Sequence, residues 1–431
     1  MFCDQCEQAR NQEGCDISPG VCGKDEDIHS AQQLLLYGLK GMSAYAHHAR
    51  RLGYHDPEVA AFMEEALFAT MTNVNFDLDS LLELCLRCGQ TNLRVMELLD
   101  QAHTETFGAP QPAEVQEGTE AGPGILVSGH DLLDLWQLLK QVEGTDIRVY
   151  THGEMLPAHM YPHLHQHPNL AGHYGRAWHE QKREFKAFPG PILVTTNCLM
   201  PPSDRYAGRL FTTRATASSQ ARRIPEDGDL SEIIEAARQC EPCPQAVEGT
   251  STVGFHHSVL LQHAGTLLDA YQQGQISQFY LIGGCDGAHK SRSYFRDYAA
   301  ATPSDSFVLT LGCGKFRIRE QEFGTHLGFP RLMDMGQCND AYSAIQVATA
   351  LAQALDVNVN DLPLTLVLSW FEQKAVAVLL TLLSLDVRGI TVGPNPPAFL
   401  SDNLFQLLQE RYDLRLTGEQ PERDAAAALA G

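Results

Sequence analysis

The sequence has few basic residues and no long apolar run. Only 31 lysines and arginines stand against 53 aspartates and glutamates, which gives a formal net charge of -22 at pH 7. Nucleic acids and anionic membrane surfaces both require a basic face, so this balance argues against either as a partner. The longest apolar run, residues 375–385, is too short for a transmembrane helix. No secretory signal peptide is evident, and we expect a cytoplasmic protein.

Nucleotide-binding glycine motifs are also missing, because neither GxGxxG nor GxxxxGKS or GxxxxGKT occurs. The chain has 431 residues, too many for one core, so we expect two to four domains. It contains 12 cysteines. In a chain expected to be cytoplasmic, this number indicates metal or redox chemistry rather than disulfides.

Three helices are predicted near the start of the chain. Apolar residues recur at helical spacing from Leu34, a second helix begins at Pro57, and Asp77 or Asp79 can cap a third. We therefore assign residues 1–106 to a helical domain.

The pattern changes at residues 107–124, which are rich in Pro, Gly and Glu and predict a linker. Short β-type runs then alternate with helical stretches, which predicts α/β architecture with mainly parallel sheets. A polar stretch at 218–249 separates a first α/β domain, 125–248, from a second, 249–431. The expected strands are 125–127, 147–150, 192–195, 279–282, 307–311, 331–334, 364–368 and 390–392.

Four cysteines lie close together in the first part of the chain. They are Cys3, Cys6, Cys15 and Cys22. Their segment has almost no apolar residues, so it predicts a compact loop around one soft metal centre. Thiolates select zinc or iron–sulfur clusters over hard cations. The alternative is a small disulfide knot, which is typical of short secreted chains.

Seven of the eight expected strands are followed, two to four residues later, by a side chain that can bind metal. These side chains are His130, Glu154, Cys198, Cys285, Cys313, Cys338 and Glu372. Taken singly, each has a simpler interpretation as a buried thiol or a solvated polar group. Together they indicate one site, because ligands bind at the C-terminal ends of parallel strands. One zinc takes only four ligands, so the mixed set predicts a multinuclear iron site with sulfur and oxygen bridges.

Nine motifs occur in an order that resembles the hybrid-cluster protein family, also called prismane proteins or hydroxylamine reductases. They are FCDQCEQ, GVCGK, TNVNFD, SGHDLLDL, YTHGEMLPAH, TTNC, GGCDGA, LGCGK and SWFEQKAVAVLL. The resemblance implies a multidomain α/β protein with an N-terminal helical domain followed by two Rossmann-like α/β domains. The short helical segment is similar to the short subgroup, which lacks the second helical bundle.

The resemblance also implies two metal clusters. It assigns the four N-terminal cysteines to a [4Fe-4S] cluster near the surface, with [2Fe-2S] as the less favoured type, because their spacing lies between the patterns of the two. It assigns the seven strand-end residues to a buried hybrid [4Fe-2O-2S] cluster. Cys285 matches the position that carries a persulfide sulfur, and Lys374 matches a lysine close to the cluster.

The implied activity is the reduction of a small N–O substrate, hydroxylamine, to ammonia and water. Electrons would enter through the N-terminal cluster from an external donor protein or reductase, and Cys285, Glu372 and Lys374 would be the catalytic residues. Nitric oxide reduction, peroxide reduction and protein S-nitrosylation through Cys285 are alternatives at the same site, and a non-catalytic redox sensor is a further one. A homo-oligomer is compatible with all of them.

Several further residues carry weaker expectations. Cys85 and Cys88 are expected as small buried thiols on the third helix. Cys240 and Cys243 fall in a turn, where metal binding or a reversible disulfide is the less favoured alternative to a structural role. Asp131 is a candidate hydrogen-bond acceptor for His130.

Overall fold

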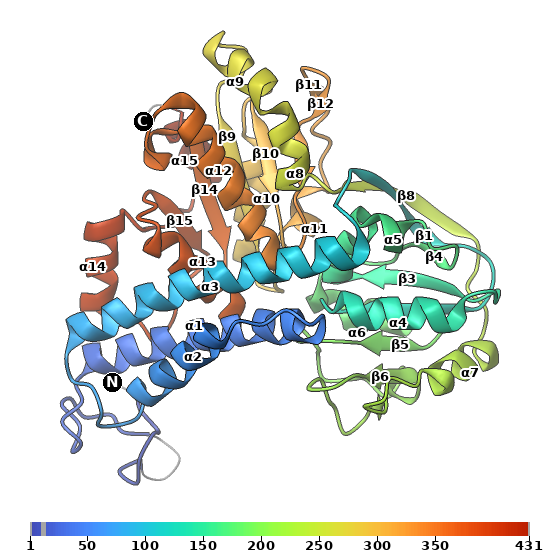
Figure 1. The fold of residues 1–431 in the computed structure, drawn as a ribbon, viewed down its shortest axis with the longest axis horizontal. Helices are drawn as coiled ribbons and strands as arrows, with labels where there is room; N and C mark the ends of the chain where they lie inside the picture. Colours follow the sequence, from blue (N-terminus) through green and yellow to red (C-terminus); the bar gives the residue numbers. More distant parts are fainter. Residues whose placement is uncertain (1, 10–13, 430–431) are drawn as a thin grey trace.

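The computed structural model describes residues 2–9 and 14–429. Figure 1 shows an N-terminal layer of helices that runs alongside two β-sheets, one built from the middle of the chain and one from its last third. No helix in these described ranges is long and apolar enough to cross a membrane.

Three helices form the N-terminal layer, as the sequence predicts. They are α1 (Glu26–Arg51), α2 (Pro57–Ala69) and α3 (Leu78–Phe107). Each begins after an aspartate, Asp25, Asp56 or Asp77, whose carboxylate accepts a backbone N–H of the first turn. Asp77 rather than Asp79 therefore caps the third helix.

The helical layer shares its core with the second sheet. Helix α13 (Gln373–Ser384) follows a strand of that sheet and packs against both α1 and α3. Two glycines permit this approach: a Cβ at Gly89 would lie 2.0 Å from the carbonyl oxygen of Leu380, and one at Gly41 would lie 2.4 Å from that of Gln373. Helix α13 is thereby held from two sides, by α1 at its first residue and by α3 at Leu380.

The first sheet has eight strands in the order β7-β6-β5-β2-β3-β4-β1-β8. Neighbours are parallel except β1 and β8, which are antiparallel. The strands are β1 (Ala113–Thr119), β2 (Gly124–Ser128), β3 (Arg148–His152), β4 (Leu170–His173), β5 (Ile192–Val194), β6 (Leu210–Thr212), β7 (Arg222–Arg223) and β8 (Ala246–Val253). The helices of this part are α4 (Leu132–Val142), α5 (Pro162–His165), α6 (Gln181–Ala187) and α7 (Ser231–Gln239).

The interpretation of residues 107–124 as a linker is wrong. This segment contains β1, which pairs with β4 and, from Ala113↔Val253 to Thr119↔Ala246, with β8. The strand is mostly half-buried or exposed, so its sequence lacks the apolar run by which strands were recognised. Because β8 belongs to the same sheet, the expected boundary between residues 248 and 249 falls inside a strand rather than between two domains.

The second sheet is fully parallel, with the order β13-β10-β9-β14-β15-β16. Its strands are β9 (Phe279–Gly284), β10 (Phe307–Thr310), β13 (Leu332–Asp334), β14 (Leu364–Ser369), β15 (Ile390–Gly393) and β16 (Arg415–Leu416), and β11 (Thr325–His326) with β12 (Phe329–Pro330) forms a separate hairpin. The helices, besides α13, are α8 (His257–Leu260), α9 (Ala264–Gln272), α10 (Ser293–Ala300), α11 (Lys315–Ile318), α12 (Ala341–Leu355), α14 (Asp402–Tyr412) and α15 (Pro421–Ala427). All eight predicted strands are confirmed across the two sheets, and mainly parallel pairing is confirmed with them.

Candidate metal centres

The four N-terminal cysteines lie in the loop that precedes α1. Cys3 and Cys15 form a β-bridge, in which the backbone N–H of Cys3 donates to the carbonyl of Cys15 at 3.2 Å and that of Cys15 donates back at 2.6 Å. Both are buried, whereas Cys6 and Cys22 are half-buried, and all four are free thiols. The bridge brings two of the four candidate ligands side by side.

A buried lysine beside this loop tests whether an anionic cluster fits there. Lys24 has no exposed surface. Its Nζ donates to the side-chain oxygens of Gln5 and Gln32, both at 2.8 Å, and lies 3.9 Å from the Sγ of Cys3. These acceptors are neutral, and a buried ammonium is costly without a compensating negative charge. A thiolate-bound iron–sulfur cluster in the loop would supply that charge.

The seven strand-end residues all lie at the C-terminal edges of the two sheets. His130, Glu154 and Cys198 follow β2, β3 and β5 of the first sheet, and Cys285, Cys313, Cys338 and Glu372 follow β9, β10, β13 and β14 of the second. Each sheet therefore supplies some of the candidate ligands. The C-terminal edges of the two sheets must face each other if these ligands are to form one site.

Hydrogen bonds between the two sheets show that the edges do face each other. The side-chain amide of Gln337 donates to the carbonyl of Glu154 at 2.6 Å and to that of His130 at 3.2 Å. The backbone N–H of Cys338 donates to Oε2 of Glu154 at 3.2 Å. One potential ligand atom from each of His130, Glu154 and Cys338 lies within 4.8 Å of the others. Residues from both sheets thus converge on one place.

Glu154 has a buried carboxylate oxygen that a bound cation would satisfy. It lies in a 3-10 helix (Gly153–Met160) after β3 and is 4% exposed. Its Oε1 is buried and has no hydrogen-bond partner among the described residues. Burial raises the pKa of Glu154 to about 7. An unpaired carboxylate oxygen is unusual in a protein interior, and a metal ion would satisfy it.

Of the four thiols of this site, Cys313 is buried and the others are half-buried, and all four act on one another. Burial raises the pKa of Cys285 to about 12 and that of Cys338 to about 11. It raises the pKa values of Cys198 and Cys313 as well, and negative charge on neighbouring thiols and on Glu154 or Glu372 adds to the effect. These thiols stay protonated without a cation, whereas a bound metal deprotonates coordinating thiols. The donor set therefore fits an iron cluster.

The backbone around these thiols is tightly packed. Cys198 adopts a φ of 71°, in the left-handed region. Gly284 has a φ of 104°, and a Cβ there would lie 2.2 Å from the carbonyl oxygen of Ser369. At Gly312, a Cβ would lie 2.6 Å from the carbonyl oxygen of Gly284. Glycine lets the turns that carry Cys285 and Cys313 approach each other closely.

The side chain of Lys374 extends from α13 to the site between the two sheets, and the residue is 3% exposed. Its Nζ lies 2.9 Å from Nε2 of His130, 3.0 Å from Oδ1 of Asn197 and 3.8 Å from Oε1 of Glu372. Burial alone would lower the pKa of Lys374, but Glu372 and the neighbouring thiols, when they carry negative charge, raise it overall. The carboxylate of Glu372 caps α13 by accepting the backbone N–H of Lys374 at 3.2 Å.

The partner of His130 differs from the one expected. Its Nδ1 lies 2.8 Å from Oγ1 of Thr196, which leaves Nε2 as the nitrogen that faces Lys374. Asp131, expected as the acceptor, instead caps α4, lies 3.2 Å from Nδ1 of His48 and pairs with Arg51. An arginine from α1 draws this carboxylate away because an ion pair is stronger than a neutral hydrogen bond.

Three side chains at the site carried no prediction. Gln337 and Asn197 are neighbours of Cys338 and Cys198, so the motifs around those cysteines could have indicated them. Tyr45 lies on α1 among core residues, and its buried hydroxyl interacts with the thiol of Cys338. With Lys374, it lines a cavity of about 10 Å³, which is close to the space that one water needs.

The remaining cysteines lie outside both groups. Cys85 and Cys88 are buried on α3, as expected, and the Sγ of Cys85 lies 3.7 Å from the carbonyl oxygen of Ala31. Cys243 is buried in a bridge with Gly122, and Cys240 is half-buried at the end of α7. All four are free thiols.

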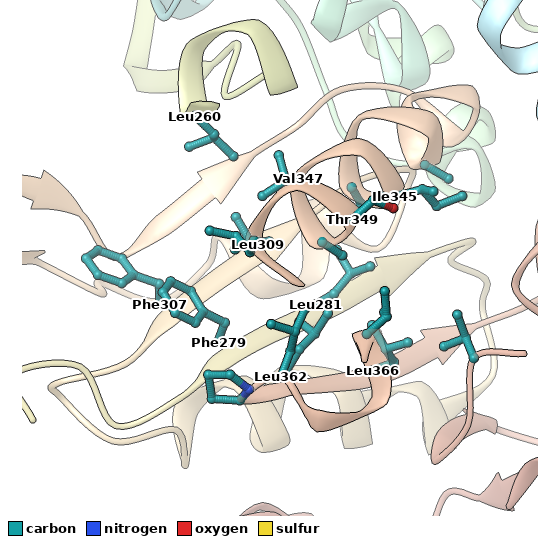
Figure 2. A pocket seen from close by; sticks show the side chains of 18 of the residues that line it. Leu260, Phe279, Leu281, Phe307, Leu309, Ile345, Val347, Thr349, Leu362 and Leu366 are labelled. Carbon is teal, nitrogen blue, oxygen red and sulfur yellow. The ribbon is translucent and has the colours of Figure 1, made fainter. Parts of the chain in front are cut away.

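A small cavity of about 60 Å³ adjoins Cys285 and Cys338. It shares the lining residues Leu311, Leu368 and Val378 with a cavity of about 340 Å³ inside the second α/β region. Figure 2 shows that apolar side chains from β9, β10, β14 and α12 line the larger one. The space next to the two thiols is therefore mostly apolar on the side of the second sheet.

Both the sequence and the fold of this chain match known proteins. The family model described as "Prismane/CO dehydrogenase family" matches residues 1–84 and 77–425. A hydroxylamine reductase of Moorella thermoacetica is 55% identical over 429 residues, 100% of either chain. One of Zymomonas mobilis is 50% identical over 405 residues, 94% of this chain and 74% of its own longer chain. Carbon monoxide dehydrogenase IV from Carboxydothermus hydrogenoformans has the same fold, with a TM-score of 0.80 at 16% identity, over 100% of this chain and 92% of that one.

Proposed function

This chain belongs to the prismane/CO dehydrogenase family, and we propose that it is a hydroxylamine reductase, an oxidoreductase that converts hydroxylamine to ammonia and water. The observation that carries the proposal is that His130, Glu154 and Cys338 from two sheets meet within 4.8 Å, beside the buried Lys374 and next to Glu372 and three further interacting thiols. Relatives named for this activity extend over the whole chain, which supports the same assignment.

We assign two iron centres to the two groups of residues. The N-terminal cysteines would hold the [4Fe-4S] cluster, and the seven strand-end residues would hold the hybrid cluster. When bound, these centres supply electron storage and Lewis acidity. The chain itself supplies the rest of the chemistry: it fixes the donors on strand ends, keeps the site apolar on one side and places a protonated group beside the reacting position.

Cleavage of the N–O bond of hydroxylamine to ammonia and water consumes two electrons and two protons, so a proton source at the site is required. Lys374 meets this requirement because its raised pKa keeps Nζ protonated while the side chain is buried. Oδ1 of Asn197 holds Nζ at 3.0 Å, and Nε2 of His130 lies 2.9 Å from Nζ while no metal occupies that nitrogen. Tyr45 and the small cavity beside Lys374 offer a position from which a water could return the proton.

The activity test is ammonia formation under anaerobic conditions with a reduced viologen dye as electron donor. Holoprotein should consume hydroxylamine and form an equal amount of ammonia. Protein that contains both iron centres and forms no ammonia would contradict the proposal.

Electrons would enter at the N-terminal loop. Several large apolar side chains near it are exposed, among them Phe2 at 64%, Val21 at 69%, Met71 at 56% and Phe76 at 47%. The segment after α2 contacts the loop, since the hydroxyl of Thr72 donates to the carbonyl of Gln5 at 3.2 Å. Exposed apolar residues around a redox centre suit a transient protein partner. We place the docking site of the external electron donor there.

Replacement of Cys6 with serine separates electron entry from substrate binding. We expect turnover with a protein electron donor to fall by about tenfold or more, while the KM for hydroxylamine changes by less than about twofold, because Cys6 is remote from the buried donors. Steady-state kinetics with both substrates varied provides the measurement. The matched control is Cys240→Ser, another half-buried thiol, which should behave like wild type. A raised KM with unchanged turnover in Cys6→Ser would refute this electron route.

A further inference from the structure

Two adjacent histidines and one aspartate form a separate group of metal-binding side chains. Asp100 lies on α3, and His256 and His257 lie at the start of α8, just after the first sheet ends. One potential ligand atom from each lies within 4.8 Å of the others, and Nε2 of His256 is 2.7 Å from Oδ1 of Asp100. These residues belong to neither group of cluster ligands described above.

The histidine rings are oriented as in metal sites. Nδ1 of His256 lies 2.9 Å from the hydroxyl of Ser258, and Nδ1 of His257 lies 2.9 Å from the hydroxyl of Ser343. When each Nδ1–H donates to its serine, the lone pair is on Nε2 of both rings. Metal-binding histidines are usually held in this manner by a partner on the other ring nitrogen.

The same distances also fit a metal-free hydrogen-bond arrangement. The backbone N–H of Ser258 lies 3.3 Å from Nδ1 of His256, an arrangement in which Nδ1 accepts and Nε2–H donates to Asp100. The two states differ in which nitrogen of His256 carries the proton. Metal binding would also widen the separation of Nε2 and Oδ1 from 2.7 Å to the ~3.3 Å that separates two ligands of a tetrahedral zinc.

The two imidazoles also lie against each other. The ring centroids of His256 and His257 are 3.9 Å apart, and His256 is buried. A cation bound beside Asp100 would therefore have two imidazoles and one carboxylate within reach.

We propose that Asp100, His256 and His257 bind a divalent transition-metal ion of the zinc class. Two imidazoles and one carboxylate are borderline donors that suit Zn²⁺, whereas Ca²⁺ and Mg²⁺ prefer oxygen alone. A water would complete a tetrahedral site. The ion has a structural role: it ties the end of α3 to the chain segment that leads from the first sheet into the second. The inference is independent of the proposed reductase activity.

Zinc binding to the anaerobic holoprotein tests the site. After dialysis against a chelator and then against Zn²⁺, inductively coupled plasma mass spectrometry should find about one more zinc per chain in wild type than in His257→Gln or in the isosteric Asp100→Asn. Comparison with these variants cancels any zinc on the N-terminal thiols. Zinc should also raise the unfolding temperature of wild type but not of the variants, and iron content reports that each variant has folded.

The matched control is His263→Gln, which removes an exposed histidine six residues further along the chain. It should bind zinc as wild type does and show the same rise in unfolding temperature. Equal zinc content in wild type, His257→Gln and Asp100→Asn, at any level, would overturn the proposal and leave the His256–Asp100 contact as a hydrogen bond only.

Discussion

Replacement of Lys374 with methionine should lower the kcat of hydroxylamine reduction by about 10²–10³-fold while both iron centres are retained. The physical reason is the position of Nζ. It lies close to His130, Asn197 and Glu372, and negative charge on its neighbours raises the pKa of Lys374. Methionine has a similar length and apolar volume, so the packing of α13 between α1 and α3 is kept.

Two comparisons make the Lys374 experiment specific. Lys374→Arg keeps the charge but places a weaker acid at the site, so it should restore ion pairing without restoring full turnover. Lys182→Met removes an exposed lysine and should leave turnover unchanged. Turnover of Lys374→Met within about threefold of wild type, with normal iron content, would rule out Lys374 as the proton donor.

Replacement of Glu372 with glutamine should lower hydroxylamine turnover by about 100-fold or more, since it removes one of the two carboxylates assigned to the buried iron centre. The variant keeps a side-chain oxygen that can accept the backbone N–H of Lys374, so the cap of α13 is preserved. Glu372→Ala removes the cap as well and should cost about 1 kcal/mol of additional stability. Measurement of turnover, iron content and unfolding temperature for both variants separates the two roles of Glu372.

Replacement of Glu372 and replacement of Cys285, compared with each other, distinguish the reductase from a thiol-based activity. Protein S-nitrosylation through Cys285 requires the thiol but not the carboxylate, so it should survive Glu372→Gln and be lost in Cys285→Ser. Hydroxylamine reduction should be lost in both. Full hydroxylamine turnover in Glu372→Gln with an intact buried cluster would contradict the ligand assignment.

Local sequence patterns predicted much of the fold because the buried parallel strands are short, continuous apolar runs. The seven strands that are followed by a candidate ligand, from β2 to β14, were found in this way. Strand β1 was missed because its exposed positions are occupied by residues such as Glu114 and Gln116, which also suit a loop. Its pairing with β8, far along the chain, supplies the stability that its own sequence does not indicate.

Long-range contacts at the site were beyond prediction from spacing. Lys374 and His130 are 244 positions apart, and only the packing of the two sheets places them 2.9 Å from each other. Tyr45 has the spacing of a core residue on α1, and Asp131 is adjacent to His130 in sequence but is drawn to Arg51. The meeting of the candidate ligands at strand ends could be predicted from the strand pattern. Hydrogen-bond partners could not, because they depend on side-chain direction.

We propose that the chain holds two separate iron centres, one in the N-terminal loop and one between the C-terminal edges of the two sheets. Anomalous diffraction from anaerobically grown crystals, collected above and below the iron absorption edge, tests it directly. We expect two iron peaks, one bounded by Cys3, Cys6, Cys15 and Cys22, the other bounded by His130, Glu154, Cys198, Cys285, Cys313, Cys338 and Glu372. Zinc alone at the N-terminal thiols, or no iron between the sheets, would contradict it.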